Sequence, residues 1–124
     1  MPLVPGSRNP EYWFREGCHI TEWSNGATDE DLSVARARVE PGQTTRWHRL
    51  AGTTERYVIL EGRGRAEVGD ELIDVIAGDV VIIPPGQPQR ITNTGEADLV
   101  FLAICTPRFQ PANYREVPEL ESES

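Results

Sequence analysis

The side chains best suited to chemistry stand in one ordered stretch, residues 42–93. His48, Glu55 and Gln89 offer an imidazole, a carboxylate and an amide oxygen, three kinds of donor to a divalent metal ion. Glycine and proline frame these donors, which predicts two pairs of strands with a turn at each end. The framing residues are Gly42 and Gly62 around the first two donors, and Gly78, Pro84, Gly86 and Asn93 around the third.

This spacing resembles both sequence motifs of the cupin superfamily. The first motif reads Gly, five residues, His-x-His, three or four residues, Glu, six residues and Gly, and here it runs from Gly42 to Gly62. The second reads Gly, five residues, Pro-x-Gly, two residues, His, three residues and Asn, and here it runs from Gly78 to Asn93. The resemblance implies an all-β fold, a small double-stranded β-helix (jelly-roll) barrel around a small-molecule pocket.

Two ligand positions depart from the family pattern. The resemblance implies that His48, Leu50, Glu55 and Gln89 occupy the four ligand positions, but Leu50 cannot bind a metal ion. Gln89 binds one only through its amide oxygen, a weaker donor than imidazole. The implied metal site is therefore His48, Glu55 and Gln89 around Mn, Fe, Ni or Zn. The alternative is a buried neutral His48, hydrogen-bonded to Glu55 or Gln89 without a metal.

Arg46 and Tyr57 are the candidate catalytic side chains. Strand alternation predicts that Arg46 shares the face of His48, where its guanidinium either grips a substrate carboxylate or phosphate or pairs with Glu55. Tyr57 shares the face of Glu55, and its hydroxyl either orients the substrate and transfers a proton or simply packs in the core. The same alternation turns Trp47 away from the cavity, as a surface or interface residue.

The elements that position these residues are predicted to be short strands. Turn residues at intervals of about ten residues, without any helical period, indicate a sandwich or barrel. Gly69-Asp70 predicts a two-residue hairpin turn, and residues 11–23 predict one or two strands packed over the barrel or over a partner subunit. The remaining strands are expected near residues 32–39, 43–50, 55–60, 65–68, 72–76, 80–83, 89–93 and 99–105.

Length and charge limit the domain organisation and the partners. A chain of 124 residues suits one domain, here residues 11–115, with an N-terminal arm over residues 1–10 and a disordered acidic tail over residues 116–124. The net charge of −8 argues against nucleic acid and anionic membranes as partners. Neither a membrane span nor a leader segment is recognisable, so a cytoplasmic protein is predicted. Cys18 and Cys105 are expected to be buried thiols rather than a disulfide.

These observations leave three functional hypotheses open. The first is a metal-dependent isomerase, epimerase or lyase acting on a small polar organic substrate, in preference to an oxygenase. The second is a non-catalytic module that binds or senses a small ligand, and the third is a structural dimeric module with a filled barrel. A homodimer is expected in each case, because Val58 and Leu60 are apolar on the outer face of a strand whose inner face is also buried.

Overall fold

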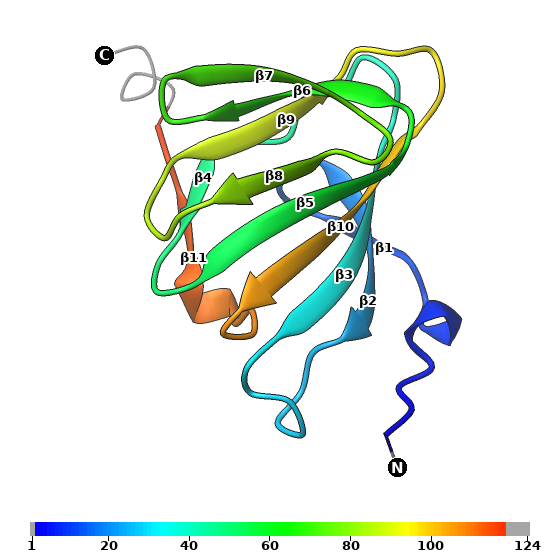
Figure 1. Cartoon of the computed structure of the whole chain (residues 1–124), viewed down its shortest axis with the longest axis vertical. Helices are drawn as coiled ribbons and strands as arrows, with labels where there is room; N and C mark the ends of the chain where they lie inside the picture. Colours follow the sequence, from blue (N-terminus) through cyan, green and yellow to red (C-terminus); the bar gives the residue numbers. More distant parts are fainter. Residues whose placement is uncertain (1, 119–124) are drawn as a thin grey trace.

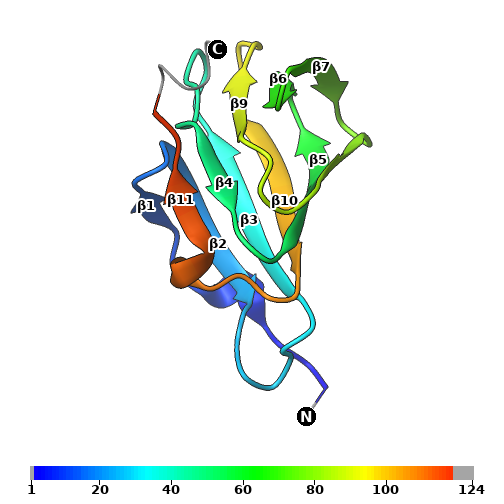
Figure 2. The same ribbon diagram turned by 90° about the vertical axis from the view of Figure 1, so that its left-hand side faces the viewer.

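The computed structural model describes residues 2–118, which form two antiparallel β-sheets packed face to face (Figures 1 and 2). The larger sheet has the order β1 (Tyr12–Phe14), β2 (Cys18–Ser24), β3 (Ser33–Val39), β10 (Leu99–Thr106), β5 (Thr54–Glu61) and β8 (Val80–Ile83). The smaller has the order β11 (Tyr114–Glu116), β4 (His48–Leu50), β9 (Gln89–Asn93), β6 (Arg63–Val68) and β7 (Glu71–Ile76). The all-β jelly-roll prediction is confirmed.

The core lies between the two sheets and follows from strand alternation. In β5, Glu55, Tyr57 and Ile59 are buried, while the residues between them face outward. In β10, Phe101 lies on the same inner side, and its ring centroid is 4.6 Å from that of Tyr57. The inward set predicted for β5 is therefore correct, and it carries Glu55 and Tyr57 into the interior.

The predicted hairpin at Gly69-Asp70 joins β6 to β7. Val68 pairs with Glu71 across the turn, and Gly69 has a φ of 58°, in the left-handed region that a glycine adopts without strain. β7 is the edge strand of the smaller sheet, and β6 pairs with β9, where Val68 is the register partner of Gln89. The hairpin therefore supports the strand that carries Gln89.

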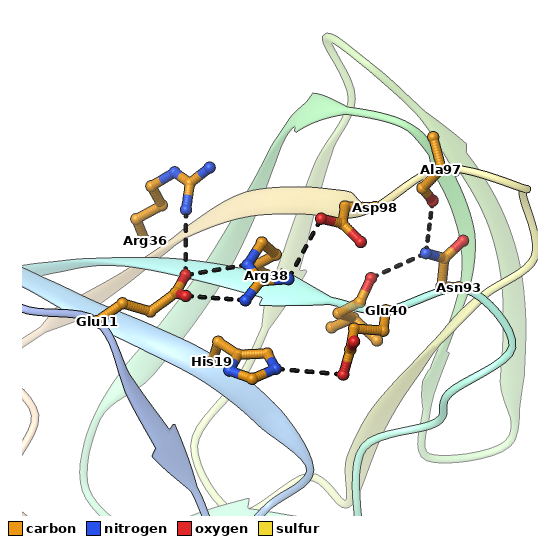
Figure 3. A network of polar contacts seen from close by, with 9 residues as sticks. Glu11, His19, Arg36, Arg38, Glu40, Asn93, Ala97 and Asp98 are labelled. Atoms are coloured by element: carbon orange, nitrogen blue, oxygen red, sulfur yellow. Dashed lines mark hydrogen bonds and ion pairs between the residues drawn. The ribbon is translucent and has the colours of Figure 1, made fainter.

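Asn93 ties the turn after β9 to the opposite sheet (Figure 3). Its Nδ2 donates to the carbonyl oxygens of Val39 and Ala97, each at 2.8 Å. Its Oδ1 accepts the Gly95 N–H at 2.9 Å. The Asn93 side chain is buried, and its three hydrogen bonds reach both β3 and the turn, so Asn93 acts as the structural anchor of the turn.

The segment before β4 breaks the expected alternation. Thr44 forms an isolated bridge with Thr92 and the Thr45 N–H donates to the Ile91 carbonyl, but regular strand pairing begins only at His48. Trp47 and His48 are consequently both buried, and the Arg90 guanidinium lies 4.4 Å from the Trp47 ring centroid. The prediction that Trp47 is a surface or interface residue is therefore wrong.

Both ends of the described chain are more ordered than the sequence indicates. Within the expected arm, η1 (Gly6–Arg8) packs its Gly6 against the backbone of Trp23. After Pro107, η2 (Pro111–Asn113) leads into β11, which pairs with β4, and the Val117 N–H donates to the Trp47 carbonyl at 3.1 Å. The rest of the predicted acidic tail, residues 119–124, lies outside the described residues. Residues 2–118 contain no helix long and apolar enough to cross a membrane.

Replacing Asn93 by alanine should destabilise the fold. Asn93→Ala removes three side-chain hydrogen bonds, one of them to the buried Val39 carbonyl, and we expect the free energy of unfolding to fall by about 2–3 kcal/mol. Denaturant titration measures this change. Glu96→Ala, in the exposed part of the same turn, is the control and should have a negligible effect. Equal stability of the two variants would contradict the anchoring role.

Candidate active-site pocket

A pocket of about 570 Å³, counted with its open mouth, lies where the N-terminal strands meet β4 and β11. Its lining combines apolar, partly aromatic side chains with several titratable ones. The apolar lining includes Phe14, Ile20, Leu50, Ala103, Phe109 and Tyr114, and the titratable lining includes Tyr12, Glu16, Glu22, His48, Glu55 and Cys105.

Glu55 is the most deeply buried carboxyl group in this pocket. Its Oε1 atom is fully buried and has no hydrogen-bond partner. Burial raises the pKa of Glu55 to about 7, an effect that His48 and a hydrogen bond from Gln89 partly offset and that Glu16 reinforces. The side chain is thus a carboxyl group that exchanges its proton near neutral pH and has one free oxygen.

Gln89 and Tyr57 hold Glu55 in place. The Tyr57 hydroxyl donates to Gln89 Oε1, so the amide nitrogen of Gln89 is left to donate to Glu55. Burial, and then the nearby Glu55, raise the pKa of Tyr57 well above its usual range. Tyr57 does not line the pocket itself. It affects the site indirectly, because its hydroxyl orients the Gln89 amide.

His48 is held on two sides. Its Nδ1 is 2.9 Å from the Arg46 carbonyl oxygen, to which it donates, and its Nε2 is 3.3 Å from Glu16 Oε2. Its ring stacks on Tyr114, with centroids 5.0 Å apart and planes at 15°. Glu16 also accepts a hydrogen bond from the Cys18 thiol at 3.1 Å. His48 therefore presents Nε2 to a carboxylate beside Glu55.

The Arg46 guanidinium lies outside the pocket. Its side chain is 65% exposed and forms an ion pair with Glu116 at 3.5 Å. The broken alternation before β4 is the reason, because it separates the direction of Arg46 from that of His48. Only the backbone of Arg46 serves the site: its carbonyl accepts from His48, and its N–H donates to the Glu16 carbonyl at 2.7 Å. The expected pairing of Arg46 with Glu55 is absent from the described residues.

The three side chains predicted to hold a metal are brought together, but as donors they suit a transition metal poorly. His48 and Gln89 are register partners on β4 and β9, and Glu55 lies beside both. However, Gln89 Oε1 already accepts from Tyr57, and Leu50 adds only an apolar wall. No three His, Cys, Asp or Glu side chains within residues 2–118 are grouped as a metal site. One imidazole and one available carboxylate are a weak set for such an ion.

Sequence reasoning missed the contribution of the chain ends. Glu16 and Tyr114 both contact His48, yet neither belongs to a recognisable motif. The N-terminal wall is held in place by Glu11, which accepts from Arg38 Nη2 at 2.8 Å and lies 3.6 Å from Arg36 (Figure 3). The aromatic residues of segment 11–23 indicate strands but do not reveal that Glu16 faces a histidine more than thirty residues away.

Comparison with known proteins agrees with this architecture. A family model described as a cupin domain matches residues 35–105. An uncharacterized protein of Methanocaldococcus jannaschii is 38% identical over 77 residues, covering 62% of each chain. The oxalate-binding protein of Thermotoga maritima is 37% identical over 70 residues, covering 56% of this chain and 58% of its own. The matched part is therefore less than two thirds of either relative.

A solved structure resembles nearly the whole chain. A Streptomyces nucleoside dehydratase variant with uridine superimposes with a TM-score of 0.80 and 18% identity, covering 95% of this chain and 92% of the other. At that identity, the likeness concerns the fold alone. It extends to the N-terminal strands and β11, which lie beyond the segment matched by the family model.

The raised pKa of Glu55 predicts a pH-dependent stability. The unfolded carboxyl titrates near 4.5 and the folded one near 7, so the folded protein binds the extra proton between these values. The contribution of Glu55 to the free energy of unfolding should therefore be intact below pH 4.5 and fall by up to about 3 kcal/mol as pH rises to 7. Glu55→Gln should remove this part of the slope.

Denaturant titrations of both proteins between pH 4 and 8 measure the difference directly. Glu71→Gln, at an exposed position on β7, is the matched control and should keep the wild-type slope. If the curves of Glu55→Gln and the wild type run parallel across this range, Glu55 titrates like an exposed carboxyl. The raised pKa of its buried carboxyl group is then wrong.

Proposed function

This chain belongs to the cupin domain family, and we propose that its pocket is the site of general acid–base chemistry on a small polar organic molecule. Isomerisation, epimerisation and elimination are the reaction types that such chemistry serves. The observation that carries the proposal is the free Oε1 atom of Glu55, which is buried in the pocket without a hydrogen-bond partner. A buried acceptor of this kind calls for a donor, and a bound ligand can supply it.

Glu55 is the proposed proton acceptor. A group with a pKa near 7 is present in both protonation states at neutral pH, which suits a general base that must release its proton again. Gln89 and Tyr57 act as positioning residues, because the chain of donors from Tyr57 through Gln89 leaves only Oε1 of the carboxylate free. The proton thus passes from a ligand C–H or O–H bond to Glu55 Oε1.

His48 is the proposed partner acid. With Nδ1–H donated to the Arg46 carbonyl, the second proton of an imidazolium sits on Nε2, between Glu16 and the ligand. From there it can be delivered to an oxygen of the ligand that gains charge or leaves. Glu16 would stabilise the protonated ring and keep it oriented. This sequence of steps uses only side chains of this chain and no metal ion.

The names of similar proteins fit two versions of this function. The structurally similar nucleoside dehydratase carries out an elimination, as its name states, on the same fold. The Thermotoga maritima relative is named for binding oxalate, which corresponds to the non-catalytic alternative. The acid–base pair favours catalysis, because binding alone does not require a carboxyl group poised near neutral pH beside an imidazole.

Proton abstraction can be tested without knowing the natural substrate. A panel of small hydroxy ketones and 3-hydroxy carbonyl compounds is incubated with the protein in D₂O, and loss of the C–H signal next to the carbonyl is followed by NMR. We expect exchange with at least one compound, and a loss of roughly 100-fold or more in Glu55→Gln and His48→Gln. Arg46→Gln should retain the exchange, because its guanidinium lies outside the pocket.

Glu71→Gln provides the second control, since this exposed carboxylate is on a strand far from the pocket in sheet order. A panel member that binds without any exchange would favour the binding module. Exchange that persists in both pocket variants would place the chemistry elsewhere.

The outer face of the larger sheet supports a homodimer. Cross-strand partners Leu102, Val58 and Val80 form one row, and Ile104 and Ile82 lie in the next row on either side of Arg56. Val80 and Ile82 are 55% and 65% exposed. We propose that a second copy covers this face around a two-fold axis, since an apolar sheet face is self-complementary under that symmetry.

Sedimentation equilibrium should therefore report a dimer at micromolar concentration. Ile82→Glu should shift the protein to monomer, because it places a charge in the apolar row. Leu72→Glu is the matched control, since Leu72 is 66% exposed but lies on the other sheet. A monomeric wild-type protein, or equal effects of the two substitutions, would contradict this interface.

A further inference from the structure

We propose that the pocket selects a positively charged ligand, a small molecule with an ammonium group on an apolar body. This inference rests on the acid–base site proposed above and names the class of molecule that it takes. Three carboxylates line the pocket, Glu16, Glu22 and Glu55. All twelve basic residues of the sequence are arginines, and within residues 2–118 none of them lines it.

The charges inside the pocket do not balance without such a ligand. His48 is the one imidazole among the described lining residues, and its Nε2 already faces Glu16 at 3.3 Å. The lining thus has three carboxylates against a single imidazole, and Glu22 has no cationic side chain beside it there. A ligand carboxylate or phosphate would be repelled by them, whereas an ammonium would be attracted at short range in a partly desolvated site.

The unsatisfied atoms of the pocket point to the same ligand. Glu55 Oε1 and the Tyr114 hydroxyl oxygen are buried without hydrogen-bond partners. An ammonium has three N–H donors, enough to satisfy both oxygens and still interact with a third group. The aromatic rings of Tyr12 and Phe14 line the same space and favour both a cation and an apolar body.

Two arginines close to the pocket are engaged outside it. The Arg15 guanidinium lies over the Tyr114 ring at 4.7 Å from its centroid, and Arg46 pairs with Glu116. Neither contributes a side chain to the lining. The net charge of −8 adds a long-range field that draws cations toward the protein and slows the approach of anions. Short-range and long-range electrostatics thus both favour a cationic ligand over an anionic one.

Three probes of matched size separate charge from shape: benzylamine, benzyl alcohol and benzoate. Calorimetric titration is done at pH 8, where Glu55 is ionised. We expect benzylamine to bind about tenfold more tightly than benzyl alcohol, and benzoate to bind most weakly. Glu22→Gln should weaken benzylamine by about fivefold and leave benzyl alcohol unchanged. Glu71→Gln should change neither.

A second measurement uses the wild-type protein alone. Lowering the pH from 8 to 5.5 protonates Glu55 and should weaken benzylamine but not benzyl alcohol, whatever the folding behaviour of Glu22→Gln. Equal binding of amine and alcohol, tightest binding of benzoate, or no binding of any probe would each overturn the charge inference. The acid–base proposal is judged separately by the deuterium-exchange panel, so the two can fail independently.

Discussion

The structure depends on burying one carboxyl group, that of Glu55, in a pocket whose described lining contains no arginine. Glu55 comes from the larger sheet and Gln89 from the smaller one, so the hydrogen bond between them joins the two sheets. Tyr57, also from the larger sheet, closes the chain by donating to Gln89. Because desolvation dominates, Glu55 keeps its proton to an unusually high pH and retains one oxygen for a ligand.

The rest of the pocket is added from outside the common part of the fold. The cupin family model covers residues 35–105, which include His48, Glu55 and Gln89. Glu16, Glu22 and Tyr114 lie beyond those limits, on the N-terminal segment and on β11. The shared segment thus contains His48, Glu55 and Gln89, whereas the flanking segments contribute Glu16, Glu22 and Tyr114 to the pocket lining. This division is one physical route by which a common fold serves different ligands.

The local pattern of the sequence was sufficient for most of the barrel. Turn residues and a period of two place β3, β5, β6, β7, β8, β9 and β10 within a few residues of their observed bounds, because strand alternation and turn chemistry are local properties. The inward direction of Glu55 and Tyr57 follows from the same alternation. Trp47 and Arg46 were misplaced because the segment before His48 leaves the ladder, and alternation holds only where a strand is paired.

The sequence by itself determined the fold class and the inward direction of Glu55 and Tyr57, and its resemblance to the cupin motifs implied that His48, Glu55 and Gln89 come together. Only the tertiary structure decided that Glu16 faces His48, that Tyr57 acts through Gln89, and that the Arg46 guanidinium is outside the pocket. The physical reason is the range of the interactions. Periodicity and turns are set by neighbours in sequence, whereas the pairing of Glu16 with His48 and the desolvation of Glu55 arise only when distant strands enclose the same space.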